Sequence, residues 1–141
     1  MSNEIEDLLP HREPFLFVDA IVQAEEKKII ATHVFTEKEF FFKGHFPEYP
    51  VVPGVILIET MAQSGGAGLR KLGILGGNAL FFLATVDKVK FRRQVRPGDE
   101  VRLEVDNLRV SPRMVKQSGK AFVGEELAAE AEWMCLVQQN A

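Results

Sequence analysis

The sequence predicts an α+β fold in which a curved antiparallel β-sheet wraps one long central helix. Residues 54–69 form a hydrophobic segment of helical length near the middle of the chain, and strand-like runs separated by turn signals precede and follow it. The chain has 141 residues, of which 46% are hydrophobic and 26% charged. That length and composition are typical of one globular domain, so we expect residues 1–141 to form a single unit.

Before the helix, the sequence predicts a short helix followed by a β-hairpin. Residues 3–9 favour an amphipathic helix capped by Asn3. Residues 15–23 are rich in apolar and β-branched side chains and predict a strand. The charged residues 25–28 predict the hairpin tip, and residues 28–35 predict the returning strand.

Two histidines in this part are assigned structural roles. His11 and Arg12 stand between Pro10 and Pro14, which favours a pinned surface turn. His33 falls within the returning strand, and we expect it to stabilise the fold rather than to act on a substrate.

The central helix carries one carboxylate among apolar side chains. Pro53 suits a first helical position, and residues 55–58 are apolar on all sides of one turn, which is typical of a buried helix. A buried carboxylate must be paired, hydrogen-bonded or protonated. Gln63 lies one turn after Glu59 and is its natural hydrogen-bonding neighbour. A position at the helix rim, with the carboxylate in water, is the alternative.

His45 lies in a stiff loop directly before this helix. Pro47, Pro50 and Pro53 each fix their own φ angle and restrict the residue before them. The loop therefore holds the imidazole in one place, where it offers a base near neutral pH beside a carboxylic acid whose proton burial retains.

The start of the helix is a candidate site for a carbonyl oxygen. The N–H groups of Gly54, Val55 and Ile56 point out of the helix with the positive end of its dipole. Negative charge developing on an oxygen would be stabilised there. The alternative is that Gly54 only eases the turn from loop to helix.

After the helix the sequence predicts several antiparallel strands and no second long helix. Gly73 and Gly76 to Asn78 mark a turn region, and residues 96–99 are a strong turn signal. Strand-like segments cover residues 79–95, 101–105, 114–123 and 126–137, with a break at 111–112 and a turn at 124–125.

Composition and charge exclude several classes of protein. The net charge of −3 argues against a nucleic-acid binder. The sequence contains no transmembrane segment, and its acidic amino terminus lacks the pattern of a secretory signal. The single cysteine, Cys135, is expected to be a thiol in the core. These features predict a cytoplasmic protein that acts away from membranes and nucleic acids.

Several short motifs are spread over nearly the whole chain. They are His45-Phe46-Pro47, Pro50-Val51, Pro53-Gly54-Val55, Glu59, Met61-Ala62-Gln63, Leu9-Pro10-His11-Arg12, the run 87–93 and Pro97-Gly98-Asp99. Together they resemble the signature of the β-hydroxyacyl-acyl carrier protein dehydratases of type II fatty acid synthesis, and most of all their Z-type branch. Glu48-Tyr49, Val52 and Thr60 depart from the residues frequent in the family and bear on substrate fit.

This resemblance implies the hot-dog fold and dehydration of a (3R)-3-hydroxyacyl thioester to the trans-2-enoyl thioester. It assigns His45 as the base at the α-carbon and Glu59 as the acid that protonates the departing hydroxyl. The N–H of Gly54, with that of Val55, would polarise the carbonyl, and Gln63 would orient Glu59. The chemistry it implies uses neither a metal nor a redox cofactor.

The resemblance also implies partners. The substrate would be an acyl-phosphopantetheine carried by acyl carrier protein, and the active site would lie between the two chains of a homodimer, with hexamers formed as trimers of dimers. Basic residues could dock the acidic carrier, although such a group is more often only a solvated face. The docking candidates are Arg92, Arg93, Arg96, Lys116 and Lys120.

Three alternatives remain from the sequence. An A-type enzyme also isomerises the double bond, but its helix usually carries aspartate at the position of Glu59. A hot-dog thioesterase would hydrolyse the thioester, usually without the histidine loop. A non-catalytic acyl-binding module would give His45 and Glu59 no reason to converge.

Overall fold

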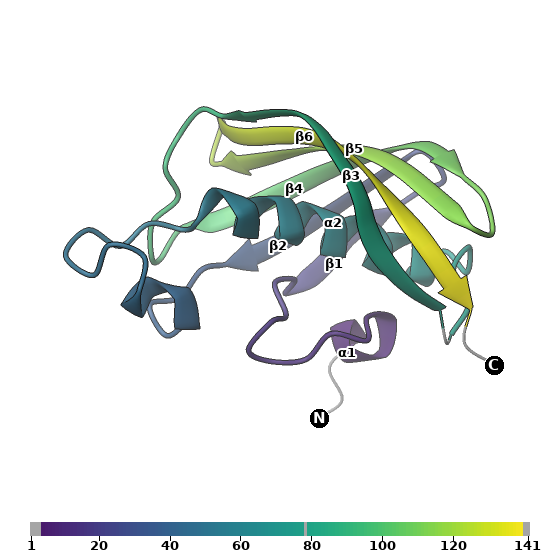
Figure 1. The fold of residues 1–141 in the computed structure, drawn as a ribbon, viewed down its shortest axis with the longest axis horizontal. Coiled ribbons are helices and arrows are strands. Elements are labelled where there is room, and N and C mark those ends of the chain that lie inside the picture. The colour runs from purple at the N-terminus through teal and green to yellow at the C-terminus, as the bar shows by residue number, and fades with distance from the viewer. Residues whose placement is uncertain (1–3, 78, 140–141) are drawn as a thin grey trace.

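The computed structural model describes residues 4–77 and 79–139. Six strands form one antiparallel sheet in the order β1-β2-β4-β5-β6-β3, and the sheet wraps around α2 (Figure 1). This arrangement confirms the α+β prediction. The elements are α1 (Glu4–Leu8), β1 (Ala20–Ala24), β2 (Lys28–Val34), the 3-10 helix η1 (Phe40–Lys43), α2 (Gly54–Lys71), β3 (Ala79–Phe91), β4 (Glu100–Val110), β5 (Met114–Val123) and β6 (Glu126–Gln139).

The helix α2 is buried along most of its length, as its apolar sequence predicts. All residues from Thr60 to Leu69 are buried. Its glycines let the sheet approach closely: a Cβ atom on Gly68 would lie 2.5 Å from the side chain of Ile29 on β2. The helix continues to Lys71, two residues beyond the predicted end, and stops before Gly73, which adopts a φ of 79°.

The structure confirms the strands predicted after α2 and the hairpin tip at residues 25–28. The prediction of a strand over residues 15–23 is mostly wrong. Only Ala20–Ala24 is a strand, whereas Phe15 to Val18 is not. The reason is that the backbone of Phe15 and Phe17 hydrogen-bonds to the side chain of Gln63 on α2 instead of to a neighbouring strand.

Two structural assignments are confirmed, and two residues named in the predictions fall outside the described chain. His33 is buried between Asp19 and Glu39, with each ring nitrogen 2.9 Å from a carboxylate oxygen. Cys135 is a buried free thiol. The helix predicted at the amino terminus is present as α1, while its expected cap Asn3 and the turn residue Asn78 lie outside the described residues.

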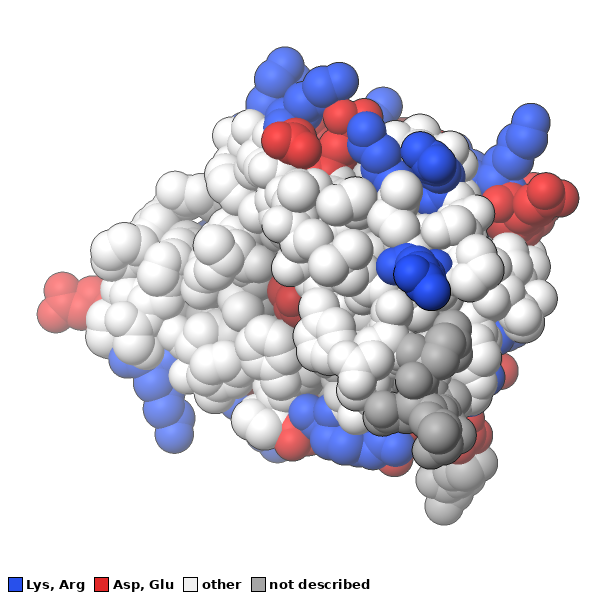
Figure 2. All heavy atoms as spheres, turned by 45° about the vertical axis from the view of Figure 1, so that its right-hand side comes forward, with Lys and Arg blue, Asp and Glu red and all other residues white. Residues whose placement is uncertain are grey.

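The strand β3 lies at one edge of the sheet and exposes large hydrophobic side chains. Within the described chain it pairs only with β6. The exposed hydrophobic side chains of β3 are Phe82, Leu83, Val86 and Phe91. Figure 2 shows a face covered mainly by uncharged side chains, with most of the charged groups at its upper and lower edges.

None of the described helices combines the length and hydropathy needed to cross a bilayer.

Candidate active site

Glu59 lies in the second turn of α2 with its side chain 21% exposed. Burial raises the pKa of this carboxyl group, and the hydrogen bond from Gln63 offsets part of that effect. The Nε2 of Gln63 donates to Glu59 Oε2 at 2.9 Å. Glu59 is therefore a carboxyl group held in one orientation and biased toward its protonated form, rather than a carboxylate extended into water.

Gln63 is fully buried, and its amide joins the helix to the segment before β1. Its Oε1 accepts a hydrogen bond from the Phe17 N–H at 2.8 Å, and its Nε2 donates to the Phe15 carbonyl at 3.2 Å as well as to Glu59. Both ends of the amide are occupied, which fixes its orientation. The orienting role of Gln63 stays a prediction, which the hydrogen bond to Glu59 supports.

His45 is fixed by the loop between η1 and α2. Its Nδ1 lies 2.9 Å from the Val51 carbonyl, and its main-chain N–H donates to the Phe41 carbonyl at 2.9 Å. Because a carbonyl can only accept, the proton of neutral His45 resides on Nδ1. The lone pair on Nε2 is then available to take a proton.

The start of α2 presents two free N–H groups instead of three. The Ile56 N–H donates to the Pro53 carbonyl at 2.9 Å, so the prediction that it is free is wrong. The N–H groups of Gly54 and Val55 have no hydrogen-bond acceptor in the described chain. The ring of Phe91 packs directly over Gly54, where a Cβ atom would lie 2.7 Å from it.

A hollow of about 530 Å³ adjoins this helix start and is lined by Gly54, Val55 and the end of β3 with the chain that follows it. Its lining includes neither His45 nor Glu59. Among the described residues of one chain, no hydrogen bond or ion pair joins His45 to Glu59. One chain therefore joins Glu59 to Gln63 by a hydrogen bond, and joins His45 to Val51 instead of to Glu59.

His11 departs from its predicted role as a surface-turn residue. Its side chain is 20% exposed, and its Nε2 lies 3.6 Å from Glu59 Oε2. The ring also contacts Phe81 on β3, with the ring centroids 5.7 Å apart. The prolines around His11 indicated a fixed turn correctly, but no spacing in the sequence indicated that α2 lies behind it.

The docking candidates differ in their surroundings. Arg92 pairs with Glu130 at 2.8 Å and Arg93 with Glu126 at 3.7 Å, while Arg96 lies 4.2 Å from the centre of the Tyr49 ring. Lys116 and Lys120 are exposed on β5. Arg92 and Arg93 also line the hollow at the start of α2.

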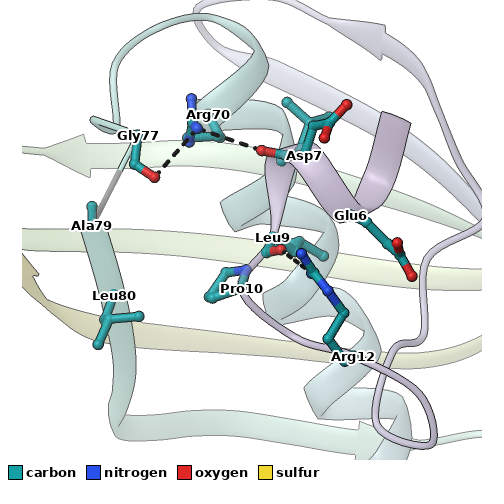
Figure 3. A pocket seen from close by; sticks show the side chains of 10 residues that line it. Glu6, Asp7, Leu9, Pro10, Arg12, Arg70, Gly77, Ala79 and Leu80 are labelled. Atoms are coloured by element: carbon teal, nitrogen blue, oxygen red, sulfur yellow. Dashed lines mark hydrogen bonds between the residues drawn. The ribbon is translucent and has the colours of Figure 1, made fainter. Parts of the chain in front are cut away.

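A second hollow of about 450 Å³ lies between α1 and the end of α2. Figure 3 shows Arg70 donating to the carbonyls of Asp7 and Gly77, and Arg12 reaching back to the carbonyl of Leu9. None of the predicted catalytic residues lines this hollow. Within residues 4–77 and 79–139, no group of three histidine, cysteine or acidic side chains is arranged to hold a metal ion.

Comparison with known families gives a consistent result. The model of the FabA-like domain matches residues 9–132. The 3-hydroxyacyl-[acyl-carrier-protein] dehydratase FabZ of Desulforamulus reducens is 48% identical over 139 residues, which cover 98% of this chain and 97% of that protein. The enzyme of the same name from Pelotomaculum thermopropionicum is 45% identical, with 96% and 97% covered.

Solved structures agree on the fold. A dehydratase heterocomplex named ApeI:P, from Xenorhabdus doucetiae, superimposes with a TM-score of 0.79 at 17% identity, covering 97% of this chain and 91% of that one. A hypothetical thioesterase with coenzyme A from Streptococcus pneumoniae superimposes with a TM-score of 0.63 at 10% identity, covering 86% of each chain. The architecture is the hot-dog fold.

Proposed function

The chain belongs to the FabA-like family, and we propose that it removes water from (3R)-3-hydroxyacyl-[acyl-carrier-protein] to give the trans-2-enoyl thioester in fatty acid biosynthesis. It is a hydro-lyase by this assignment. The observation that carries the proposal is the 2.9 Å approach of His45 Nδ1 to the Val51 carbonyl, which places the proton on Nδ1 and leaves Nε2 as the free base. A base alone would also suit other reactions, but the FabZ names of the relatives favour dehydration without isomerisation or hydrolysis.

The proposed reaction divides the work among three groups. Nε2 of His45 takes a proton from the α-carbon, and the electrons of that C–H bond form the new C=C bond. The N–H groups of Gly54 and Val55 stabilise the charge that develops on the thioester oxygen. The C–O bond at the β-carbon breaks as Glu59 gives its proton to the hydroxyl group, which leaves as water. Transfer of the proton from His45 back to Glu59 restores the enzyme.

We propose that His45 of one chain acts with Glu59 of a second copy. Two observations support a homodimer. Among the described residues of one chain no hydrogen bond or ion pair joins His45 to Glu59, and β3 is a long edge strand with exposed hydrophobic side chains. An unpaired edge of this kind favours pairing with another strand. Three such dimers would form the hexamer that the family resemblance implies.

We propose that the basic residues near the start of α2 receive the acyl carrier protein. Arg92 and Arg93 line the hollow beside Gly54, so a carrier held there could direct its phosphopantetheine arm toward the helix start. Arg96, Lys116 and Lys120 would extend this surface.

The proposed function is tested with crotonyl-[acyl-carrier-protein], whose hydration is the reverse reaction and removes the ultraviolet absorbance of the enoyl thioester. The variants are His45→Ala and Glu59→Gln. Loss of a general acid or base lowers kcat by roughly 100-fold or more, and we expect each variant to show this while retaining the native circular dichroism. Substantial turnover by the double variant would end the assignment, and release of free thiol by the wild-type protein would indicate a thioesterase.

A further inference from the structure

We propose that His11 is a positioning residue that holds Glu59 so that Oε1, rather than Oε2, carries the proton delivered to the substrate. This inference rests on the proposed function, because it assumes that Glu59 is the acid. It extends that function to the amino-terminal segment before β1, which the structure places beside Glu59. The contact that carries it is the 3.6 Å approach of His11 Nε2 to Glu59 Oε2.

The protonation of His11 follows from its surroundings. Burial and the neighbouring Arg12 lower the pKa of this histidine, so the ring is neutral at pH 7. Its Nδ1 is buried and has no hydrogen-bond partner among the described residues. An unpaired lone pair there is preferable to an unpaired N–H donor, because a carboxyl oxygen is close to the other nitrogen. The proton of neutral His11 is therefore on Nε2, facing Glu59.

One donor and one nearby nitrogen then face the same oxygen of Glu59. The Nε2 of Gln63 donates to Oε2 at 2.9 Å, and the Nε2 of His11 approaches the same oxygen to 3.6 Å. The distance from His11 is longer than a hydrogen bond, and a shift of a few tenths of an ångström on substrate binding would close it. An oxygen that then accepts from both donors is the carbonyl-like oxygen of a carboxylic acid, which leaves the hydroxyl proton on Oε1.

The turn that presents His11 is rigid enough to serve this role. The Nη1 of Arg12 donates to the carbonyls of Leu9 and His11 at 2.8 and 2.7 Å, and Figure 3 shows the guanidinium reaching back to Leu9. Leu9 is buried in the core. The Phe81 ring packs against the imidazole. The position of His11 is thus set by the hydrogen bond to its carbonyl and by the contact of its ring with Phe81.

The other ionisable group near Glu59 is the thiol of Cys135 on β6, whose pKa burial raises to about 12. It is protonated and neutral at pH 7, and among the described residues Arg12 is the charged group that lowers the pKa of His11. Among the described residues, Gln63 is the hydrogen-bond partner of the Glu59 carboxyl, and the Nε2 of His11 lies 3.6 Å from it.

The experiment compares His11→Phe, which keeps a planar ring but removes the N–H, with His11→Gln, whose amide restores a donor at a similar reach. Glu13→Gln, in the same exposed turn, is the matched control. Two quantities are measured: kcat and KM for hydration of crotonyl-[acyl-carrier-protein], and the pKa of Glu59 from the ¹³C resonance of its labelled carboxyl carbon, assigned by its absence in Glu59→Gln. The second measurement needs no substrate.

We expect His11→Phe to lower kcat roughly tenfold with KM changed less than about twofold, and to raise the Glu59 pKa, because a donor to the carboxylate is lost. His11→Gln should recover most of both effects, and Glu13→Gln should match the wild type. A Phe variant with the wild-type kcat and Glu59 pKa would overturn the inference, and so would a Gln variant as impaired as the Phe variant. Failure of the proposed function is a different result, in which Glu59→Gln itself retains turnover.

Discussion

The side-chain amide of Gln63 donates a hydrogen bond to the Glu59 carboxyl group at 2.9 Å, one turn away on α2. The same amide accepts from the Phe17 N–H and donates to the Phe15 carbonyl. The Gln63 side chain thus orients the proposed acid and also holds the segment that precedes β1. It therefore contributes both to the candidate active site and to the stability of the fold.

Replacing Gln63 should therefore affect both stability and activity. Gln63→Leu leaves the buried Phe17 N–H without an acceptor, and we expect the free energy of unfolding to fall by about 2 kcal/mol. Gln63→Glu is the matched variant, because it keeps an acceptor for Phe17 but removes the donor to Glu59. Urea unfolding should show the larger loss for Gln63→Leu, while hydration kinetics should show a lower kcat for both. Equal stability of the Leu variant and the wild type would contradict this account.

Gly54→Ala should perturb the helix start without unfolding the protein. The added Cβ atom would meet the Phe91 ring at 2.7 Å, and this ring is exposed enough to move. The displaced ring would alter the hollow beside the free N–H groups, and we expect kcat/KM for crotonyl-[acyl-carrier-protein] to fall about tenfold, since a small misplacement at a site is costly. Combining Gly54→Ala with Phe91→Leu should restore part of the activity, and an unchanged kcat/KM in Gly54→Ala would refute the prediction.

Because of His33, the free energy of unfolding should decrease as the pH becomes alkaline. Burial lowers the pKa of His33, but the hydrogen bonds that its ring donates to Asp19 and Glu39, with the negative charge of these carboxylates, outweigh burial and raise the pKa to about 9 from 6.5. A raised pKa in the folded state means that the stabilisation is complete below pH 6.5 and is lost as the pH rises through about 9. At about 1.4 kcal/mol per pH unit, the loss is on the order of 3 kcal/mol. Urea unfolding at several pH values measures it, and His33→Gln, which does not titrate, should lack this dependence.

The proposed sharing of the site between chains predicts complementation. When His45→Ala and Glu59→Gln chains are unfolded, mixed in equal amounts and refolded, about half of the dimers should contain one chain of each kind. Each of these has one intact His45–Glu59 pair, so activity should return to about a quarter of the wild-type value. If native mass spectrometry proves that mixed dimers form and activity stays absent, each chain builds its own site.

The difference between the strand predicted at residues 15–23 and the observed β1 explains where sequence patterns stop being informative. Apolar and β-branched side chains predicted an extended backbone there, but they could not say what its N–H and C=O groups would bond to. In the structure Phe15 and Phe17 bond to Gln63, 46 or more residues away in the chain. His11 was misassigned for the same reason, because its partner Glu59 is on another element.

The sequence by itself determined the central helix, the hairpins, the proline-fixed loop and the identity of the candidate acid and base, because periodicity, proline geometry and a lone carboxylate in an apolar helix are local properties. The tertiary structure alone decided that Val51 sets the tautomer of His45, that Ile56 is not a free donor, and that His11 reaches Glu59. Those facts depend on which distant segments come within hydrogen-bonding distance, and a few ångströms between packed elements are not encoded in any short stretch of residues.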